Sequence, residues 1–125
     1  MKTVSFYGTC SALSSLVLVS PRIGTPFVLK QIHVRFPVGC ENKVLLRFYV
    51  AIDDYAPSSG APSGVSLLSD YGQVDYVVGD GDEKKLENEV EVAEGGAFLK
   101  VYAVNKDYFG HDVDVQMYIE PLTRR

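Results

Sequence analysis

Apolar and polar residues alternate most regularly near the carboxyl end of the chain. Across residues 112–120, every second position is apolar and the others are mostly polar, which predicts a β-strand with one apolar face. Residues 98–104, just before it, are apolar at nearly every position, as is typical of a strand covered on both faces. Residues 105–111 between the two segments include Asn, Asp and Gly, which favour turns. Residues 97–120 therefore predict a long β-hairpin.

Two long segments nearer the amino end show similar alternation. Residues 27–36 place two rows of side chains on opposite faces: Val28, Ile32, Val34 and Phe36 on one, and Leu29, Gln31, His33 and Arg35 on the other. Residues 43–52 contain one apolar row and one mixed row. Residues 37–42 between the segments include Pro37, Gly39 and Asn42, which favour a turn. We therefore expect the two segments to pair as neighbouring strands.

Shorter segments complete an all-β pattern. Strands are predicted at residues 3–9, 15–20, 65–68, 73–78 and 86–93. Residues 83–87 alone could begin a helix, but the alternation of Val90 and Val92 with acidic residues favours a strand. Eight or nine strands separated by turn residues predict an antiparallel two-sheet sandwich. A jelly roll is the first expectation, and another Greek-key sandwich is the second.

The chain length of 125 residues fits one domain, which we place at residues 1–125. Within it, residues 1–20 form either an extended arm or an edge strand, and an arm could add a strand to a neighbouring sheet. No segment reaches the ~18 to 20 apolar residues of a membrane span. Gly8, Thr9 and Ser11 interrupt any signal peptide, so we expect a chain made in the cytoplasm.

Charge and cysteine content narrow the possible partners and cofactors. The net charge of −4 and the lack of a basic block argue against nucleic acid as a partner. Cys10 and Cys40 have no His or Cys at metal-ligand spacing, and we expect two small buried side chains rather than a disulfide. The acidic turn at Asp80, Asp82 and Glu83 offers oxygen ligands that calcium prefers, without the spacing of a calcium-binding loop. A solvated turn is the alternative, and no other cofactor is expected.

Catalytic chemistry is not expected from this sequence. His33 lies in a predicted strand and His111 at a predicted turn, and no nucleophile motif accompanies either of them. No glycine-rich phosphate loop opens a helix. The sequence therefore favours a non-enzymatic protein over an enzyme that acts through its clustered aspartates.

Recognition is expected on loops. Residues 53–64 form the longest predicted loop, and loops of this length are often functional. Tyrosine rings on loops offer amphipathic contacts of the kind that anchor interfaces. The candidate interaction residues are Tyr55, Pro57, Tyr71 and Tyr108. For the long loop, a connector without a partner is the alternative.

Residues 29–40 form a predicted strand that ends in the turn Phe36-Pro37-Val38-Gly39, and residues 101–119 form the closing pair of segments. In this pattern the chain resembles small jelly-roll domains of structural proteins of viruses and proviruses. The resemblance covers most of residues 27–121 and transfers no functional residues. It implies a virion structural or capsid-decoration role, with copies of the chain or a capsid shell protein as partner. The alternative is a β-sandwich module that binds a carbohydrate or a cell surface, with a surface glycan as a possible partner.

Overall fold

The computed structural model describes residues 2–36, 38–39, 43–55, 62, 64–67, 76–81, 83–87, 90–92 and 95–122. These residues form nine strands and no helix: β1 Lys2–Cys10, β2 Ser15–Val19, β3 Phe27–Arg35, β4 Val44–Ala51, β5 Val65–Ser66, β6 Glu83–Leu86, β7 Val90–Val92, β8 Phe98–Asn105 and β9 His111–Pro121. The predicted all-β class is confirmed. Within the described part of the chain, no helix is long and apolar enough to cross a membrane.

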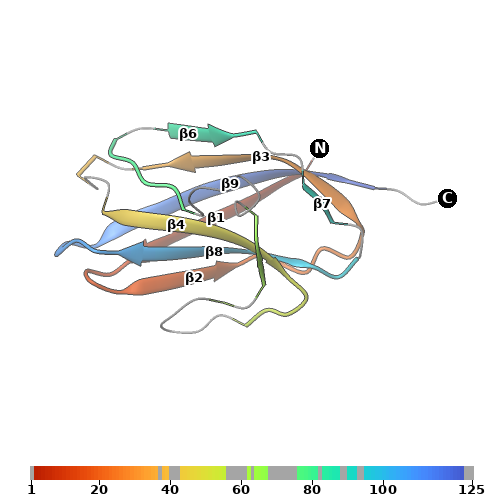
Figure 1. Cartoon of the computed structure of the whole chain (residues 1–125), viewed down its shortest axis with the longest axis horizontal. Helices are drawn as coiled ribbons and strands as arrows, with labels where there is room; N and C mark the ends of the chain where they lie inside the picture. The colour runs from red at the N-terminus through yellow and green to blue at the C-terminus, as the bar shows by residue number, and fades with distance from the viewer. Residues whose placement is uncertain are drawn as a thin grey trace.

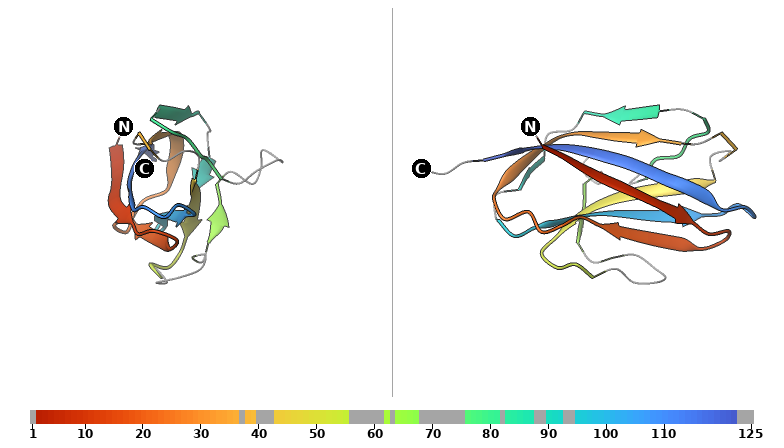
Figure 2. Two further views of the ribbon diagram at one scale, coloured as in Figure 1. Left: turned by 90° about the vertical axis from the view of Figure 1, so that its left-hand side faces the viewer. Right: turned by 180° about the vertical axis from the view of Figure 1, so that it is seen from behind.

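The strands form two antiparallel sheets that face each other (Figure 1). Sheet A has the order β1-β9-β3-β6, with β7 also paired to β3, and sheet B has the order β2-β8-β4-β5. The pairs are nested along the chain, because β1 pairs with β9, β2 with β8, β3 with β6 and β7, and β4 with β5. Additional pairs, β3 with β9 and β4 with β8, roll this nested ribbon into two layers, which Figure 2 shows from the end and from behind. This is the jelly-roll arrangement, and that prediction is confirmed.

Two predicted hairpins are wrong. Strands β8 and β9 lie in different sheets, and so do β3 and β4. The physical reason is that each of these strands is interior to its sheet and needs a hydrogen-bonding neighbour on both edges, which the crossing connections allow. Side-chain alternation reports which face of a strand is buried, and it carries no information about which strand lies beside it.

A β-bulge corrects the predicted faces of β3. The register between β3 and β9 shifts between Leu29 and Gln31, so one extra residue, Lys30, interrupts the alternation. Leu29 consequently lies on the buried face together with Ile32 and Val34, whereas Val28 is only partly buried. The sequence pattern alone had placed Leu29 on the opposite face.

Other predicted strands are shorter in the structure. Of the strand predicted at residues 86–93, the structure has β7 at Val90–Val92, and β6 at Glu83–Leu86 precedes it where the sequence left a helix start open; both strands pair with β3. The segment at residues 65–68 contains β5, and Leu68 lies outside the described residues. Of residues 73–78, the first three also lie outside them, and Val77 makes an isolated bridge to Leu46.

The core lies between the two sheets. Its largest fully buried apolar side chains include Phe27, Phe48, Leu29, Ile32, Leu46, Leu99, Met117 and Ile119. Edge strands β1 and β2 approach closely where the sandwich closes, and a Cβ on Gly8 would lie 3.1 Å from Leu16 Cδ2 and 3.2 Å from Leu18 Cδ2. The absence of a side chain at Gly8 therefore allows the two sheet edges to meet.

The connections between strands divide the molecule into two ends. The β1–β2, β3–β4 and β8–β9 connections lie together at the end opposite the termini, which we call the loop end (Figure 1). The amino-terminal start of β1 and the end of β9 lie at the other end. A binding site made of clustered loops could therefore lie at either end of the sandwich.

Candidate functional site

The loop end exposes large apolar side chains. Tyr108 is 77% exposed and Phe109 is 72% exposed on the β8–β9 connection, and Leu13 is 60% exposed on the β1–β2 connection. Val38, on the β3–β4 connection, is 88% exposed. We call these four residues the loop-end surface. Exposed apolar residues that gather on one part of a protein commonly mark an interaction site.

A buried asparagine fixes the connections beneath this surface. Asn105 is 2% exposed, and its Nδ2 donates hydrogen bonds to the carbonyl oxygens of Phe109, Cys10 and Ser11 at 2.8, 3.1 and 3.3 Å. Its Oδ1 accepts a hydrogen bond from the Asp107 N–H at 2.9 Å. One side chain therefore joins the β1–β2 connection to the β8–β9 connection.

Asp107 and His111 form a second link in the β8–β9 connection. His111 Nε2 donates to Asp107 Oδ2 at 2.8 Å, and both side chains are largely buried. The hydrogen bond from His111 lowers the pKa of the Asp107 carboxyl group. The Tyr108 N–H and Lys43 lower this pKa further, whereas burial raises it by less. The Asp107 carboxylate thus favours its charged form where it organises the backbone that carries Tyr108.

Leu13 is held in an uncommon backbone conformation. Its φ angle is 52°, in the left-handed region that residues with side chains rarely adopt. Its N–H donates to the carbonyl oxygen of Asp107 at 3.0 Å, which ties the β1–β2 connection to the β8–β9 connection. The uncommon conformation is therefore supported from a neighbouring connection, and the Leu13 side chain is exposed.

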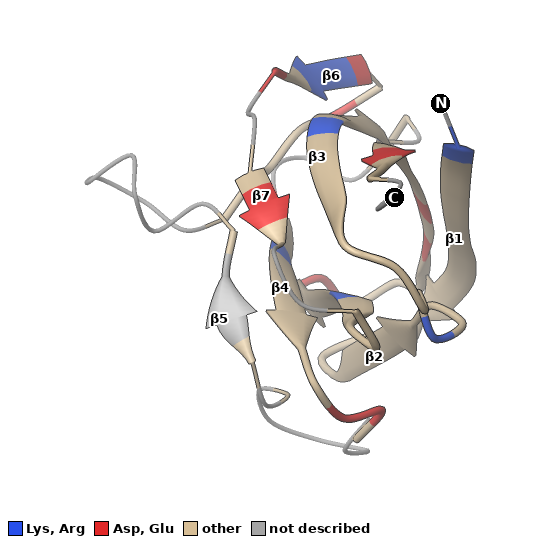
Figure 3. Cartoon of the chain, turned by 90° about the vertical axis from the view of Figure 1, so that its right-hand side faces the viewer, with Lys and Arg blue, Asp and Glu red and all other residues tan. Residues whose placement is uncertain are grey.

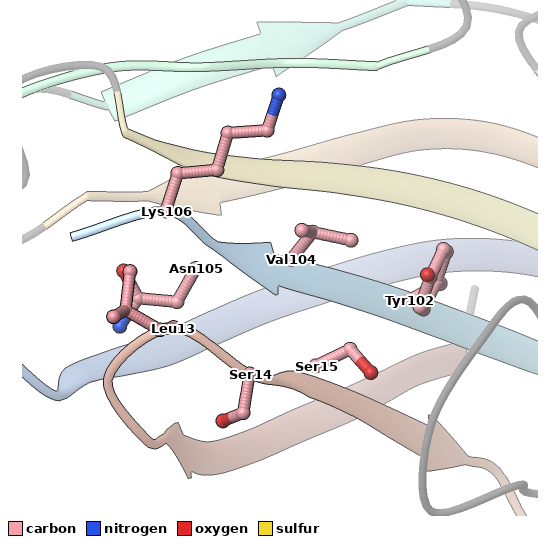
Figure 4. A pocket seen from close by; sticks show the side chains of 7 residues that line it. All are labelled: Leu13, Ser14, Ser15, Tyr102, Val104, Asn105 and Lys106. Carbon is pink, nitrogen blue, oxygen red and sulfur yellow. The ribbon is translucent and has the colours of Figure 1, made fainter.

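A groove on the outer face of sheet B begins at the loop end (Figure 4). Its volume is about 510 Å³, within the range of small-ligand sites. The lining residues come from the β1–β2 connection, β2, β8 and the residue after β8: Leu13, Ser14, Ser15, Tyr102, Val104, Asn105 and Lys106. The groove therefore combines apolar side chains with the serines of β2 and the connection before it, whereas the side chain of Lys106 extends away from them across β4.

Aromatic residues and one arginine lie beside this groove on the same sheet face. The Arg47 guanidinium carbon is 5.9 Å from the ring centroid of Tyr102 and 5.5 Å from that of Tyr76. Tyr102 and Arg47 are cross-strand partners in β8 and β4. Cation–π contacts of this kind favour a fixed position of the Tyr102 ring beside Arg47.

The outer face of sheet A is polar. His33 Nε2 lies 3.2 Å from Glu83 Oε2, and these two residues line a small hollow of about 110 Å³ with Arg35, Asp114 and Gln116. Figure 3 shows that charged residues mark β6 and β7, whereas β2 carries none. The outer face of sheet A is therefore more charged at these strands than β2 of sheet B, and the groove on sheet B is larger than the hollow on sheet A.

Cys10 lies directly opposite His111 in the register between β1 and β9. A cysteine beside a His–Asp pair resembles a nucleophile with its base, but the thiol is fully buried and donates to the carbonyl oxygens of Ser14 and Ala103 at 3.5 and 3.9 Å. Burial raises the pKa of the Cys10 thiol, which disfavours the reactive thiolate. Cys10 is a free, buried thiol, and Cys40 lies outside the described residues.

The acidic turn predicted as a calcium candidate has other contacts. Asp80 Oδ1 accepts a hydrogen bond from the Gly39 N–H at 2.9 Å, and Glu83 is paired with His33. Asp82 lies outside the described residues. Among the residues that the structure describes, no group of three or more His, Cys, Asp and Glu is arranged to hold a metal ion.

The candidate interaction residues do not form one site. Tyr108 belongs to the loop-end surface, whereas Tyr55 is 61% exposed on the loop after β4. Pro57 and Tyr71 lie outside the described residues. The start of the long loop is attached to sheet B, because the fully buried Lys100 donates to Asp53 Oδ1 and to the Tyr55 carbonyl oxygen, both at 2.9 Å.

Sequence reasoning missed the parts played by Asn105 and Lys100. The sequence pattern identifies Asn105 only as a turn residue, although an Asn two residues before an Asp at the end of an apolar strand is a sign of side-chain-to-backbone bonding. Lys100 lies in the segment that the sequence predicts to be covered on both faces, and nothing in that pattern indicates a partner for its ammonium group. The distant Asp53 that neutralises it has no local sequence signal.

No protein-family model and no curated protein sequence matches the chain. Among solved structures, a chain of infectious bursal disease virus, Gt strain, is similar over 94% of this chain and 30% of its own, with a TM-score of 0.56 and 6% identity. This chain thus spans less than a third of that viral chain. A chain from naturally occurring empty particles of cowpea mosaic virus is similar over 97% of this chain and 84% of its own, with a TM-score of 0.45 and 8% identity. The carbohydrate-binding module TmCBM61, in complex with β-1,4-galactotriose, is similar over 91% and 69% of the two chains, with a TM-score of 0.46 and 14% identity. At these identities the likeness concerns the fold alone, and at that level the resemblance to jelly-roll domains of viral structural proteins is confirmed.

Proposed function

We propose that this chain is a structural module of a virion-type assembly, whose jelly rolls associate through the loop-end surface with copies of themselves or with a capsid shell protein. The observation that carries the proposal is the exposure of Tyr108 and Phe109, 77% and 72%, on a connection that is fixed from below. Aromatic side chains presented to solvent in this way are typical anchors of protein interfaces.

The fixed backbone supports this use of the surface. Asn105 and Asp107 bond the connection on both sides of its exposed tip, so the aromatic side chains are presented with little backbone freedom. Binding by a rigid surface loses less conformational entropy than binding by a loose one, which favours association. The proposed location of the chain is accordingly the virion.

The test is size-exclusion chromatography with light scattering over a wide range of protein concentrations. We expect the wild-type chain to form oligomers, and the double variant Tyr108→Ser, Phe109→Ser to be monomeric at the same concentrations. Ile52→Ser is the matched control, because Ile52 is 84% exposed on the loop after β4, outside the loop-end surface. This variant should behave as the wild type.

Association with a shell protein is measured separately, by co-sedimentation of the chain with assembled shells. If self-association is absent, retention on shells that is lost in the double variant would support the shell-protein form of the proposal. A wild-type chain that is monomeric at every concentration and is not retained on shells would contradict it.

A further inference from the structure

Strand β1 forms one edge of sheet A, because among the strands that the structure describes it pairs with β9 alone. An edge strand presents backbone N–H and C=O groups on which a strand of another chain can pair. β1 is nine residues long, and its register with β9 runs from Lys2 to Cys10 without a bulge. After Lys2 it contains no charged residue and no proline (Figure 3). β1 therefore lacks the features by which proteins commonly protect an edge: shortness, charge, proline and bulges.

The opposite edge of sheet A does have such protection. β6 is four residues long and includes Glu83, Lys84 and Lys85, and β7 is three residues long with Glu91 at its centre. In Figure 3 both strands carry charged residues, whereas β1 does so only at its start. The edge strands of sheet B are short as well, since β2 has five residues and β5 has two. Among the described strands, β1 is thus the longest uncharged edge.

The first half of β1 is the more open part of this edge. At the loop end β1 and β2 lie close together, where Leu16 and Leu18 approach Gly8. Toward the termini the two strands diverge, as the view from behind in Figure 2 shows. Residues 2–7 therefore lie where β2 no longer runs beside β1, and this segment is the part of the edge that a further strand can reach.

This segment is suited to pairing with itself. Antiparallel pairing about a two-fold axis perpendicular to the sheet keeps the inner faces of both copies on the same side. On the outer face, the exposed residues Thr3, Ser5 and Tyr7 then lie opposite residues of this same set, and all of them are uncharged and carry hydroxyl groups. The two Lys2 charges lie at opposite ends of an antiparallel pair, whereas parallel pairing would place them side by side. A second copy therefore fits this edge without bringing like charges together.

Pairing through β1 also ends after one step. Each copy has one β1, so a two-fold pair uses this edge in both copies. The edges of sheet A that remain are the short, charged strands β6 and β7. Sheet A is thereby extended across the axis, and the charged outer edges oppose growth into an open-ended fibre.

We propose that β1 pairs antiparallel with β1 of a second copy, so that sheet A continues across a two-fold axis. This inference rests on the proposed association through the loop-end surface, because pairing over so short a segment is weak alone. Copies already joined through Tyr108 and Phe109 present two β1 edges, and two linked contacts bind more strongly than one. The two surfaces are separate, since β1 runs along the side of the sandwich.

The first experiment measures oligomer mass by size-exclusion chromatography with light scattering. Ser5→Lys places a charge at the exposed edge, where the two copies would meet. We expect it to lower the mean mass of the oligomers about twofold, because each β1 pair joins two units. Gln31→Lys is the matched control, since it adds the same charge to the outer face of sheet A on the interior strand β3, and it should behave as the wild type. Thermal melts establish that both variants are folded.

The second experiment measures amide hydrogen exchange in β1 below and above the concentration at which the wild type associates. The amides of β1 that point away from β9 should exchange roughly tenfold more slowly in the associated state, and this protection should be absent in Ser5→Lys. Equal masses for Ser5→Lys and Gln31→Lys, or unchanged exchange of β1 at the highest concentration, would overturn the inference.

The two proposals fail in different variants. If Tyr108→Ser, Phe109→Ser is monomeric while Ser5→Lys associates as the wild type, the loop-end proposal holds and β1 pairing is wrong. If the loop-end variant instead keeps both its mass and the protection of β1, the loop-end proposal is contradicted and β1 pairing stands on its own. Protection of β1 that appears only on assembled shells would identify a strand of the shell protein as the occupant, against a second copy.

Discussion

Replacement of Asn105 by alanine should destabilise the whole domain from a single buried side chain. In the wild type, Nδ2 bonds the carbonyl oxygens of Phe109 and Cys10 at 2.8 and 3.1 Å, and Oδ1 accepts the Asp107 N–H at 2.9 Å. Each of these neutral hydrogen bonds contributes about 1 kcal/mol net to stability, so the three together contribute about 3 kcal/mol. Because Asn105 is 2% exposed, water does not readily replace them.

The expected change is large enough to measure by two methods. The entropy of unfolding is about 2.1 cal/mol/K per residue, so a loss of about 3 kcal/mol lowers the Tm by about 11 °C for a domain of this size. Urea denaturation should show the same loss as a lower midpoint with an unchanged slope. Lys106→Ala, which changes the exposed side chain at the next position, outside this hydrogen-bond network, is the matched control and should change stability by less than about 0.5 kcal/mol.

A result near zero would refute the reasoning. If Asn105→Ala unfolds within about 0.5 kcal/mol of the wild type, then the described hydrogen bonds do not hold the loop end together. Amide hydrogen exchange adds a local measurement, since the variant should lose protection first at Asp107 and Leu13, whose N–H groups are bonded within this network.

Three further changes test other parts of the fold. Val101→Asp places an unpaired charge where the wild-type side chain is 1% exposed, so it should abolish the cooperative melt, and a melt near the wild-type temperature would show that β8 is not central. Asp107→Asn removes a carboxyl group whose pKa is lowered chiefly by the hydrogen bond from His111. The ionised carboxylate stabilises the fold above its unfolded pKa of 3.8, and this contribution is lost as the pH falls through the lower pKa of the folded state. The variant should therefore be less stable than the wild type near neutral pH and should lose less stability on acidification. Urea denaturation at a series of pH values measures both effects. Gly64→Ala should lower the Tm by several degrees, because φ is 126° and a Cβ would lie 2.7 Å from the Val50 carbonyl oxygen; an unchanged Tm would contradict that geometry.

The buried faces of the strands were largely predictable, and the strand neighbours were not. Val113, Val115, Met117 and Ile119 all lie in the core as their alternation predicts. Alternation depends on the environment of each strand alone, whereas pairing depends on the partner, and the chain crosses from one sheet to the other between β8 and β9. The bulge at Lys30 shows a related limit, because one inserted residue reverses the faces of all positions before it.

The candidate site was predictable only in part. Tyr108 was expected to be exposed on a turn, and it is. The groove on sheet B combines residues from β2 and β8, which are far apart in the sequence, so no local pattern could bring Ser15 and Tyr102 together. The burial of Lys100 was also not predictable from local sequence, because it depends on Asp53 in a distant loop.

The nested pairing of strands has a consequence for how this protein is made. Strand β9 lies between β1 and β3 in sheet A, and its residue Ile119 is opposite Lys2. A ribosome therefore releases the first strand of sheet A long before the strand that joins it to the rest of the sheet. Contacts between such distant residues make folding slow, and during synthesis the edges of β1 and β3 are open to pairing with other chains. A nascent chain that stops before residue 111 has no central strand for sheet A, so chaperone protection of the early strands should raise the yield of folded protein.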